Sequence, residues 1–220
     1  MTALSYTFPN DFIWGAATAA HQIEGNNVSS DWWAREHSPN TDLSEASNDA
    51  CDSYNRFEED IRLLAASGLR MYRFSIEWAR IEPECGCFSK AQLLHYRRMI
   101  DTCRQYGVEP MVTLYHMTLP LWFAEQGGWR RADAVERFRR YIEYVLPILH
   151  DVTWVCTLNE PNMVALTRGG TEGSDFIAAS LPYPDPEISE NLVAAHRSAR
   201  EVLSSVPSIK SGWTIACQAF

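Results

Sequence analysis

The sequence has no long apolar run. Its 220 residues are 46% hydrophobic and 21% charged, which is typical of a water-soluble globular protein. No apolar run approaches the roughly 20 residues that span a bilayer. The start of the chain, Met1 to Asp11, has neither a basic stretch nor an apolar core, so we expect no secretory signal there. These absences predict no membrane partner and a cytoplasmic location.

Positive charge is scarce, and metal-ligand spacings are absent. The formal net charge of −9 argues against a nucleic-acid partner. Cys85 and Cys87 have no second Cys or His pair at a ligand spacing, so we predict no metal, and we expect no cofactor. The cysteines are expected to be reduced thiols rather than a disulfide framework. There are six, at positions 51, 85, 87, 103, 156 and 217.

Strand and helix patterns alternate along the chain. Strands are predicted near 12–25, 69–78, 108–116, 153–159 and 212–220, helices near 49–67, 89–106, 133–150 and 185–202, and loops near 26–48, 119–123 and 167–185. This order predicts a parallel sheet in a single α/β domain over residues 1–220. A five-stranded doubly wound sheet is the alternative. No glycine-rich phosphate loop follows the first strand, which disfavours its nucleotide-binding form.

The segment 153–159 has the period-two alternation of a strand and is followed by Asn159, Glu160 and Pro161. Proline cannot extend a strand ladder, and it should hold Glu160 in an extended conformation. We therefore expect Asn159 and Glu160 at the carboxyl edge of the sheet, where α/β barrels perform their chemistry. For an isolated Asn-Glu-Pro tripeptide, a simple turn is the plainer interpretation.

Apolar and polar residues also alternate in the segment 69–78. An interior Arg73 would need an anionic partner to offset its desolvation, whereas on an exposed edge strand it would be solvated. Taken by itself, the second interpretation is the simpler one. In a barrel, we expect the apolar set to face the helices and the polar set to face the interior. The apolar set is Tyr72, Phe74, Ile76 and Trp78, and the polar set is Arg73, Ser75 and Glu77.

Two more predicted strands end on polar side chains. The segment 12–25 is rich in glycine and alanine, which leave room for a ligand, and it ends near His21 and Gln22. The segment 108–116 ends on His116. A lone histidine at a strand end is more often a structural hydrogen-bonding group than a catalytic one. The context of the other strand ends makes both segments candidates for a binding site.

Four segments, taken in order, resemble glycoside hydrolase family one, the β-glucosidase family. They are F-I-W-G-A-A-T-A-A-H-Q-I-E-G at 12–25, Y-R-F-S-I-E-W-A-R-I-E-P at 72–83, His116 with L-P-L-W-F at 119–123, and T-L-N-E-P at 157–161. The similarity runs from about Ser5 onward and is weakest across 162–187. The resemblance implies a (β/α)8 TIM barrel, of which this chain supplies about the first five strands and four helices.

The resemblance also implies a retaining β-glycosidase acting on small-molecule glycosides with terminal β-linked sugars. In such enzymes two carboxyl groups about 5 Å apart flank the scissile bond. Glu160 matches the catalytic acid/base, which must be protonated to donate to the leaving oxygen and then ionised to activate water.

The substrate-binding candidates follow from the same match. Asn159 matches the residue that hydrogen-bonds the sugar 2-hydroxyl, while Gln22 and His116 match residues that bind the 3- and 4-hydroxyls. Arg73 matches the arginine that lies beside the nucleophile. The carboxylate of that nucleophile would then be the anionic partner of Arg73. Trp122, in the aromatic loop, is a further candidate for contact with the substrate.

Two positions depart from the family pattern. Met117 stands where the family usually has tryptophan after the strand-end histidine, and Asn162 stands where an aromatic residue often follows Asn-Glu-Pro. Both lie where a sugar or aglycone would pack, so the specificity of that part of the site is open.

The family's nucleophile is a glutamate on the seventh strand, in a Glu-Asn-Gly context, and the strand pattern here reaches only the fifth. Glu24 and Glu77 match other positions. We therefore expect the 220 residues to be the amino-terminal part of a longer enzyme, inactive alone, or a chain that needs a complement. The open edges of a five-stranded partial barrel favour a complementary chain or a homo-oligomer.

The alternative function is a non-catalytic sugar-binding or scaffold half-barrel that keeps Gln22, His116 and Asn159. A third possibility is an unrelated α/β sugar-binding protein. In that case Glu160 would lie outside any pocket shared with Gln22 and His116.

Overall fold

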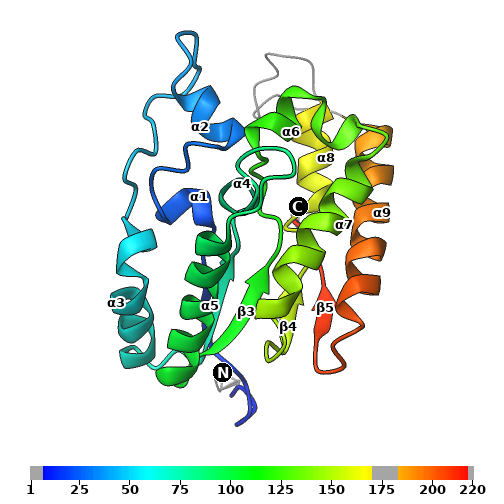
Figure 1. Cartoon of the computed structure of the whole chain (residues 1–220). Helices are drawn as coiled ribbons and strands as arrows, with labels where there is room; N and C mark the ends of the chain where they lie inside the picture. The colour runs from blue at the N-terminus through cyan, green and yellow to red at the C-terminus, as the bar shows by residue number, and fades with distance from the viewer. Residues whose placement is uncertain (1–6, 170–182, 218–220) are drawn as a thin grey trace, which may run out of the picture.

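A five-stranded parallel sheet forms the centre of the computed structural model, which describes residues 7–169 and 183–217. Each strand pairs in parallel with the next one along the chain, so the spatial order equals the sequence order (Figure 1). A doubly wound sheet would instead reverse its order at a switch point. The fold is therefore the first part of an α/β barrel, as predicted. The strands are β1 Gly15–Ala17, β2 Met71–Ser75, β3 Glu109–Thr113, β4 Trp154–Cys156 and β5 Lys210–Gly212.

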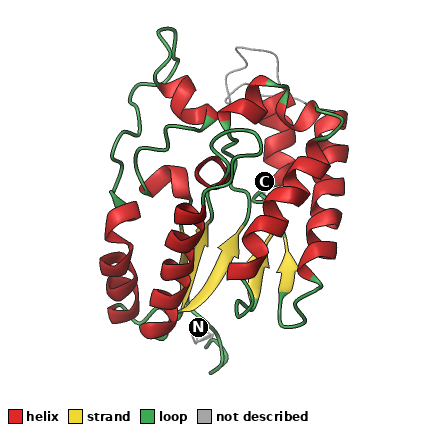
Figure 2. Ribbon diagram, in the orientation of Figure 1, coloured by secondary structure: helices red, strands yellow, loops and turns green. Residues whose placement is uncertain are grey.

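Four long helices make the crossovers between successive strands and cover one face of the sheet (Figure 2). Two of their starts follow from capping chemistry that the sequence signals. The Ser89 hydroxyl accepts a hydrogen bond from the backbone N–H of Gln92, and the Asp185 carboxylate accepts one from Ile188. The long helices are α3 Ser53–Ala66, α5 Lys90–Gln105, α7 Ala134–Val145 and α9 Pro186–Leu203.

Shorter helical segments lie mainly beyond the carboxyl ends of the strands, at the upper end of Figure 1. Pro161 stands at the first position of α8, where its missing N–H costs no hydrogen bond. These segments are α1 Ala20–Ile23, α2 Asp31–Glu36, α4 Trp78–Ile81, α6 Leu121–Glu125, η1 Gly128–Arg130, η2 Leu146–Ile148 and α8 Pro161–Gly169.

The core lies between the sheet and the long helices. Tyr72 and Phe74 are each 2% exposed, and Ile76 and Trp78 continue the same buried row. This confirms the predicted buried face, but the predicted strand is too long, because β2 ends at Ser75 and Trp78 begins α4. Glu77 is the buried N-cap of α4 and not a strand residue that faces the interior. On the opposite face of the sheet Arg73 is only half-buried, and Gly15 and Ala17 of β1 are exposed. Within the described residues that second face has no covering layer of helices.

The first predicted strand is wrong in length. β1 ends at Ala17, and the chain then turns into α1, so His21 and Gln22 lie on a short helix rather than at a strand end. The cause is a tertiary contact, because the Ser75 hydroxyl accepts a hydrogen bond from the Ala20 N–H at 2.7 Å. A side chain of the neighbouring strand thereby satisfies one of the N–H groups that a helix start leaves unpaired.

Other boundaries also need correction. The predicted loops at 26–48 and 119–123 contain α2 and the start of α6, and α8 fills the segment after Pro161. β5 begins at Lys210, two residues before the predicted strand. Lys, Ser and Gly form strands poorly, so pairing with β4 sets this position and local preference does not. Parts of the predicted 167–185 loop and of the 212–220 strand lie outside the described residues.

Candidate functional site

The carboxyl ends of the parallel strands all lie at one edge of the sheet, and the predicted site residues gather at or just beyond it. Asn159 and Glu160 follow β4, His116 follows β3, and Gln22 is on α1 after β1. Arg73 points from the middle of β2 onto the face away from the long helices. One edge of the sheet thus brings together side chains from four crossover units.

Arg73 and Asn159 are in direct contact. The Arg73 Nη2 donates a hydrogen bond to the Asn159 Oδ1, and its Nε donates to the Thr113 hydroxyl at 2.9 Å. Thr214, beyond β5, donates from its hydroxyl to the same Asn159 oxygen at 2.9 Å. With its oxygen occupied twice, the buried Asn159 amide is held in one orientation, and no hydrogen bond between described residues uses its Nδ2. Among the described residues, Arg73 forms no ion pair, so its expected anionic partner is not found there.

Glu160 has a backbone conformation that the sequence does not predict. Its φ is +48°, in the left-handed region, and not extended as expected before proline. Its N–H donates to the carbonyl oxygen of Thr214 at 3.1 Å, and its own carbonyl accepts from Met163 and Val164 at the start of α8. These bonds outweigh the usual preference of a residue before proline. Its half-buried side chain projects from a backbone fixed on both sides.

His116 is half-buried, and its Nδ1 has no hydrogen-bond partner within the described residues. Burial first, and then the nearby positive charge of Arg73, lower the pKa of His116 to about 4. The ring is therefore neutral at physiological pH and has one N–H donor and one nitrogen acceptor. That is a suitable partner for a neutral hydroxyl group.

Gln22 and Trp122 differ in how their side chains are placed. The Gln22 side chain is exposed on α1. The Trp122 indole N–H donates to the carbonyl oxygen of Glu82 at 2.9 Å, and the Arg137 guanidinium lies over its ring at 5.7 Å from the centroid. Within the described part of the chain, no hydrogen bond or ring contact joins either residue to Asn159, Glu160 or His116. Their roles toward a substrate stay predictions.

Sequence reasoning missed the groups that orient the site. Thr113 and Thr214 set the geometry of Arg73 and Asn159, and Thr118 anchors the loop after His116. Threonine is common in strands for its β-branched shape, so nothing in its spacing marks these three as site residues. Only their tertiary contacts reveal them, since Thr113 is on β3 while Thr118 and Thr214 lie in loops.

The fold and the site define a partial α/β barrel with polar side chains gathered at its carboxyl edge. The family model described as glycosyl hydrolase family 1 matches residues 4–206. The chain therefore belongs to glycosyl hydrolase family 1, in agreement with the resemblance of its motifs.

Individual relatives agree with this assignment. Beta-glucosidase A of Acetivibrio thermocellus is 37% identical over 207 residues, which cover 88% of this chain and 45% of that protein. The lactase/phlorizin hydrolase of Homo sapiens is 36% identical over 219 residues, 95% of this chain and 11% of that protein. The solved family 1 β-glucosidase from Thermotoga maritima matches with a TM-score of 0.84 and 35% identity, covering 94% of this chain and 48% of that one.

The chain spans about half the length, or less, of the curated relatives cited above. Among the residues that the structure describes, no helix combines the length and apolar character that crossing a membrane requires.

Proposed function

We propose that this chain supplies the acid/base half of a retaining β-glycosidase, acting on terminal β-linked sugars. The observation that carries the proposal is the direct contact of Arg73 with Asn159, which precedes Glu160 in the chain, together with the bond from Arg73 to Thr113 of β3. Residues from three strands are thereby joined at the catalytic edge of a barrel.

In the first step, Glu160 would donate its carboxyl proton to the glycosidic oxygen as the bond from that oxygen to the sugar C1 breaks and a second carboxylate bonds to C1. In the second step, the Glu160 carboxylate would take a proton from water while the water oxygen attacks C1 and releases the second carboxylate. The same group must therefore act first as an acid and then as a base. Its left-handed backbone, held by Thr214 and by α8, supports a fixed direction of approach.

The neighbouring groups would bind the sugar. Asn159 Nδ2, which no described residue's hydrogen bond occupies, would donate to the 2-hydroxyl. The neutral His116 ring and the exposed Gln22 amide would bind the 3- and 4-hydroxyls. Trp122 is proposed as a further substrate contact.

The second carboxylate would come from outside the described residues. Arg73 has no anionic partner there. Glu24 is paired with Arg80 at 2.7 Å, and Glu77 accepts a hydrogen bond from Thr118 at 2.7 Å. Neither is free to act as nucleophile. We infer that strands six to eight, in the same chain or in a complementary one, provide this group about 5 Å from Glu160.

The test is turnover of an aryl β-glucoside by the 220-residue chain, alone and mixed with a chain that supplies strands six to eight. We expect activity only in the mixture and its loss in Glu160→Gln. Glu143→Gln, at an exposed position on α7, is the matched control and should keep full activity. Turnover by the chain alone that survives Glu160→Gln would contradict the proposal.

A second candidate is a non-catalytic sugar-binding half-barrel, favoured by the commitment of Glu24 and Glu77 to other partners. It predicts that the mixture binds glucose, with loss of affinity in Asn159→Ala and His116→Ala, but never turns over a glucoside. Calorimetry on the same samples separates the two functions. For both, a single domain over 1–220 and a cytoplasmic location stay predictions.

A further inference from the structure

The Glu77 side chain is buried beneath the loop that follows His116, and the proposed mechanism does not use it. Glu77 is 3% exposed. Its Oε2 accepts a hydrogen bond from the Thr118 hydroxyl at 2.7 Å, and its Oε1 accepts one from the Ala79 N–H at 3.2 Å, at the start of α4. Among the described ion pairs, none includes Glu77. A buried carboxyl without a cationic partner is costly, which suggests a task other than stability.

The contact partner lies in a strained loop. Met117, between His116 and Thr118, has a φ of +70°, which is unfavourable for a residue with a side chain. The Thr118 N–H donates to the His116 carbonyl at 3.0 Å, closing a tight turn. On the far side of Thr118, the Leu119 N–H is fixed by the Asp31 carboxylate at 2.8 Å. Glu77 therefore anchors the turn directly next to the candidate sugar-binding histidine.

We propose that Glu77 is a positioning residue for His116, acting through its hydrogen bond to Thr118. The ionised carboxylate accepts this bond strongly, because charge-assisted hydrogen bonds are about twice as strong as neutral ones. A protonated Glu77 holds Thr118 more weakly, and the strained turn at Met117 then relaxes. The orientation of the His116 ring thus depends on the charge of Glu77. The consequence for sugar binding rests on the proposed function.

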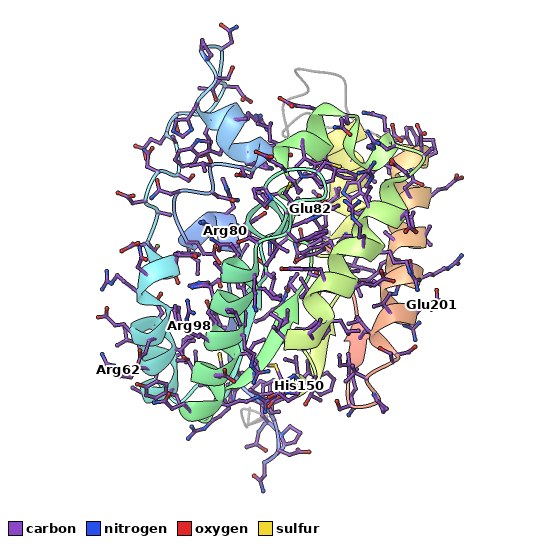
Figure 3. The ribbon with its side chains drawn as sticks, viewed as in Figure 1. Arg62, Arg80, Glu82, Arg98, His150 and Glu201 are labelled. Atoms are coloured by element: carbon purple, nitrogen blue, oxygen red, sulfur yellow. The ribbon has the colours of Figure 1, made fainter. Side chains whose placement is uncertain are left out.

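The surroundings of Glu77 support a change of charge near neutrality. The pKa of Glu77 is raised to about 7 in all: burial has the largest effect and the negative charge of Glu24 also raises it, while the bonds from Thr118 and Ala79 and the charge of Arg80 lower it. Arg80, labelled in Figure 3 beside α1, is already paired with Glu24. The other titratable groups that face Glu77 are the buried hydroxyls of Tyr96 on α5 and Tyr141 on α7.

The test is NMR of the 220-residue chain in complex with a chain that supplies strands six to eight, with histidine rings labelled only in the former, followed from pH 5.5 to 8.5. The six histidines allow assignment of His116 from the signal lost in His116→Asn. Because the pKa of His116 itself is lowered to about 4, a step near pH 7 in the chemical shifts of its ring must come from the titration of a neighbouring group. We expect such a step in the native chain and its loss in Glu77→Gln. Glu84→Gln, at an exposed carboxyl between α4 and α5, should keep it.

Thr118 provides the second pair of variants, in case Glu77→Gln does not fold. Thr118→Ser keeps the hydroxyl and should keep the step, whereas Thr118→Val removes the hydroxyl and should abolish it. A purely structural contact would change stability in Thr118→Val without a pH-dependent effect on the ring. A step that persists in Glu77→Gln or Thr118→Val, or no step in the native chain, would overturn the inference.

A second measurement uses the chain completed by strands six to eight. Glu77→Gln should lower kcat/KM for a full β-glucoside by about tenfold, the worth of one hydrogen bond. For the 3-deoxy and 4-deoxy glucosides the loss should be smaller, since the contact with His116 is already missing. Equal losses for all substrates would contradict the positioning role. If the completed chain hydrolyses nothing while the NMR step depends on Glu77, the proposed function fails and the inference stands.

Discussion

Two residues directly after candidate site residues have left-handed backbones. Met117 follows His116, and Glu160 follows Asn159. This conformation costs roughly 1–2 kcal/mol for a residue with a Cβ atom. Hydrogen bonds from Thr118, Thr214 and the start of α8 hold both turns in place. Strain of this kind is often found where a side chain must be presented in one fixed direction.

The strain at Glu160 can be measured directly. Glu160→Gly should be more stable than Glu160→Ala by about 1 kcal/mol in urea unfolding, because glycine adopts a positive φ at no steric cost. The same pair of substitutions at Glu136, exposed on α7, should give the opposite order, since glycine weakens a helix by about 1 kcal/mol relative to alanine. If alanine is the more stable residue at position 160 as well, the backbone there is not strained.

The buried carboxyl of Glu77 should make stability depend on pH. The folded protein keeps the proton up to about pH 7, whereas the unfolded chain loses it near 4.5. Stability therefore falls as pH rises from 4.5 to 7, by about 3 kcal/mol for this group, and stays at the lower level above that range. Glu77→Gln should remove most of this fall in denaturation curves at pH 5 and pH 8. Glu84→Gln should not, and an equal fall in both variants would refute the assignment.

At the scale of elements, short helices are fixed by side chains of their neighbours. α1 depends on Ser75 of β2 for its first N–H. α4 is tied to α7 through Glu82, which is fully buried and accepts from Trp78, Gly86 and Arg140. Figure 3 labels Glu82 beside α7. A helix of four residues is too short to be stable alone, so these contacts decide whether it forms.

Ser75→Ala should therefore loosen α1. Loss of the acceptor leaves the Ala20 N–H buried and unpaired, which costs about 1–3 kcal/mol. Hydrogen exchange should become faster at residues 20–24 while α5 stays protected. Ser67→Ala, at an exposed helix end, is the control and should leave hydrogen exchange unchanged both at residues 20–24 and in α5. Unchanged exchange at residues 20–24 in Ser75→Ala would show that α1 does not need this bond.

At the scale of the molecule, the described sheet is open. β1 and β5 each pair on one side only within the described residues. Beside β1, the rings of Phe8, Phe12 and Trp14 pack against one another with centroids 4.6 to 4.8 Å apart, yet Phe8 is 59% exposed and Trp14 52%. Unpaired strand edges and exposed aromatic clusters favour association.

We accordingly expect the 220-residue chain to self-associate or aggregate, and a chain supplying strands six to eight to replace this with a defined complex. Light scattering after size exclusion, across a range of concentrations, checks the outcome. Phe8→Ser/Trp14→Ser should reduce self-association of the lone chain. Leu94→Ser, at an exposed position on α5, should have little effect. A stable monomer at high concentration would show that the open edges are tolerated.

Much of the fold follows from local sequence signals. The caps at Ser89 and Asp185 predict the starts of α5 and α9, and the alternation around Phe74 predicts which face of β2 is buried. His116, Asn159 and Glu160 lie beyond the carboxyl ends of β3 and β4, on the expected side of the sheet. The two strands are shorter than predicted, because β3 ends at Thr113 and β4 at Cys156. Each of the correctly predicted features depends on chemistry within a few residues, which a sequence displays directly.

Other features depend on groups distant in the chain. α1 needs Ser75, the left-handed Glu160 needs Thr214, and the position of β5 depends on its register with β4. The sequence alone determined the alternation of strands and helices, the buried face of the sheet and the polar ends of its strands. Only the tertiary structure decided how Asn159 is oriented, how Glu160 is directed and how Glu77 is buried, because contacts between residues far apart in sequence set each of them.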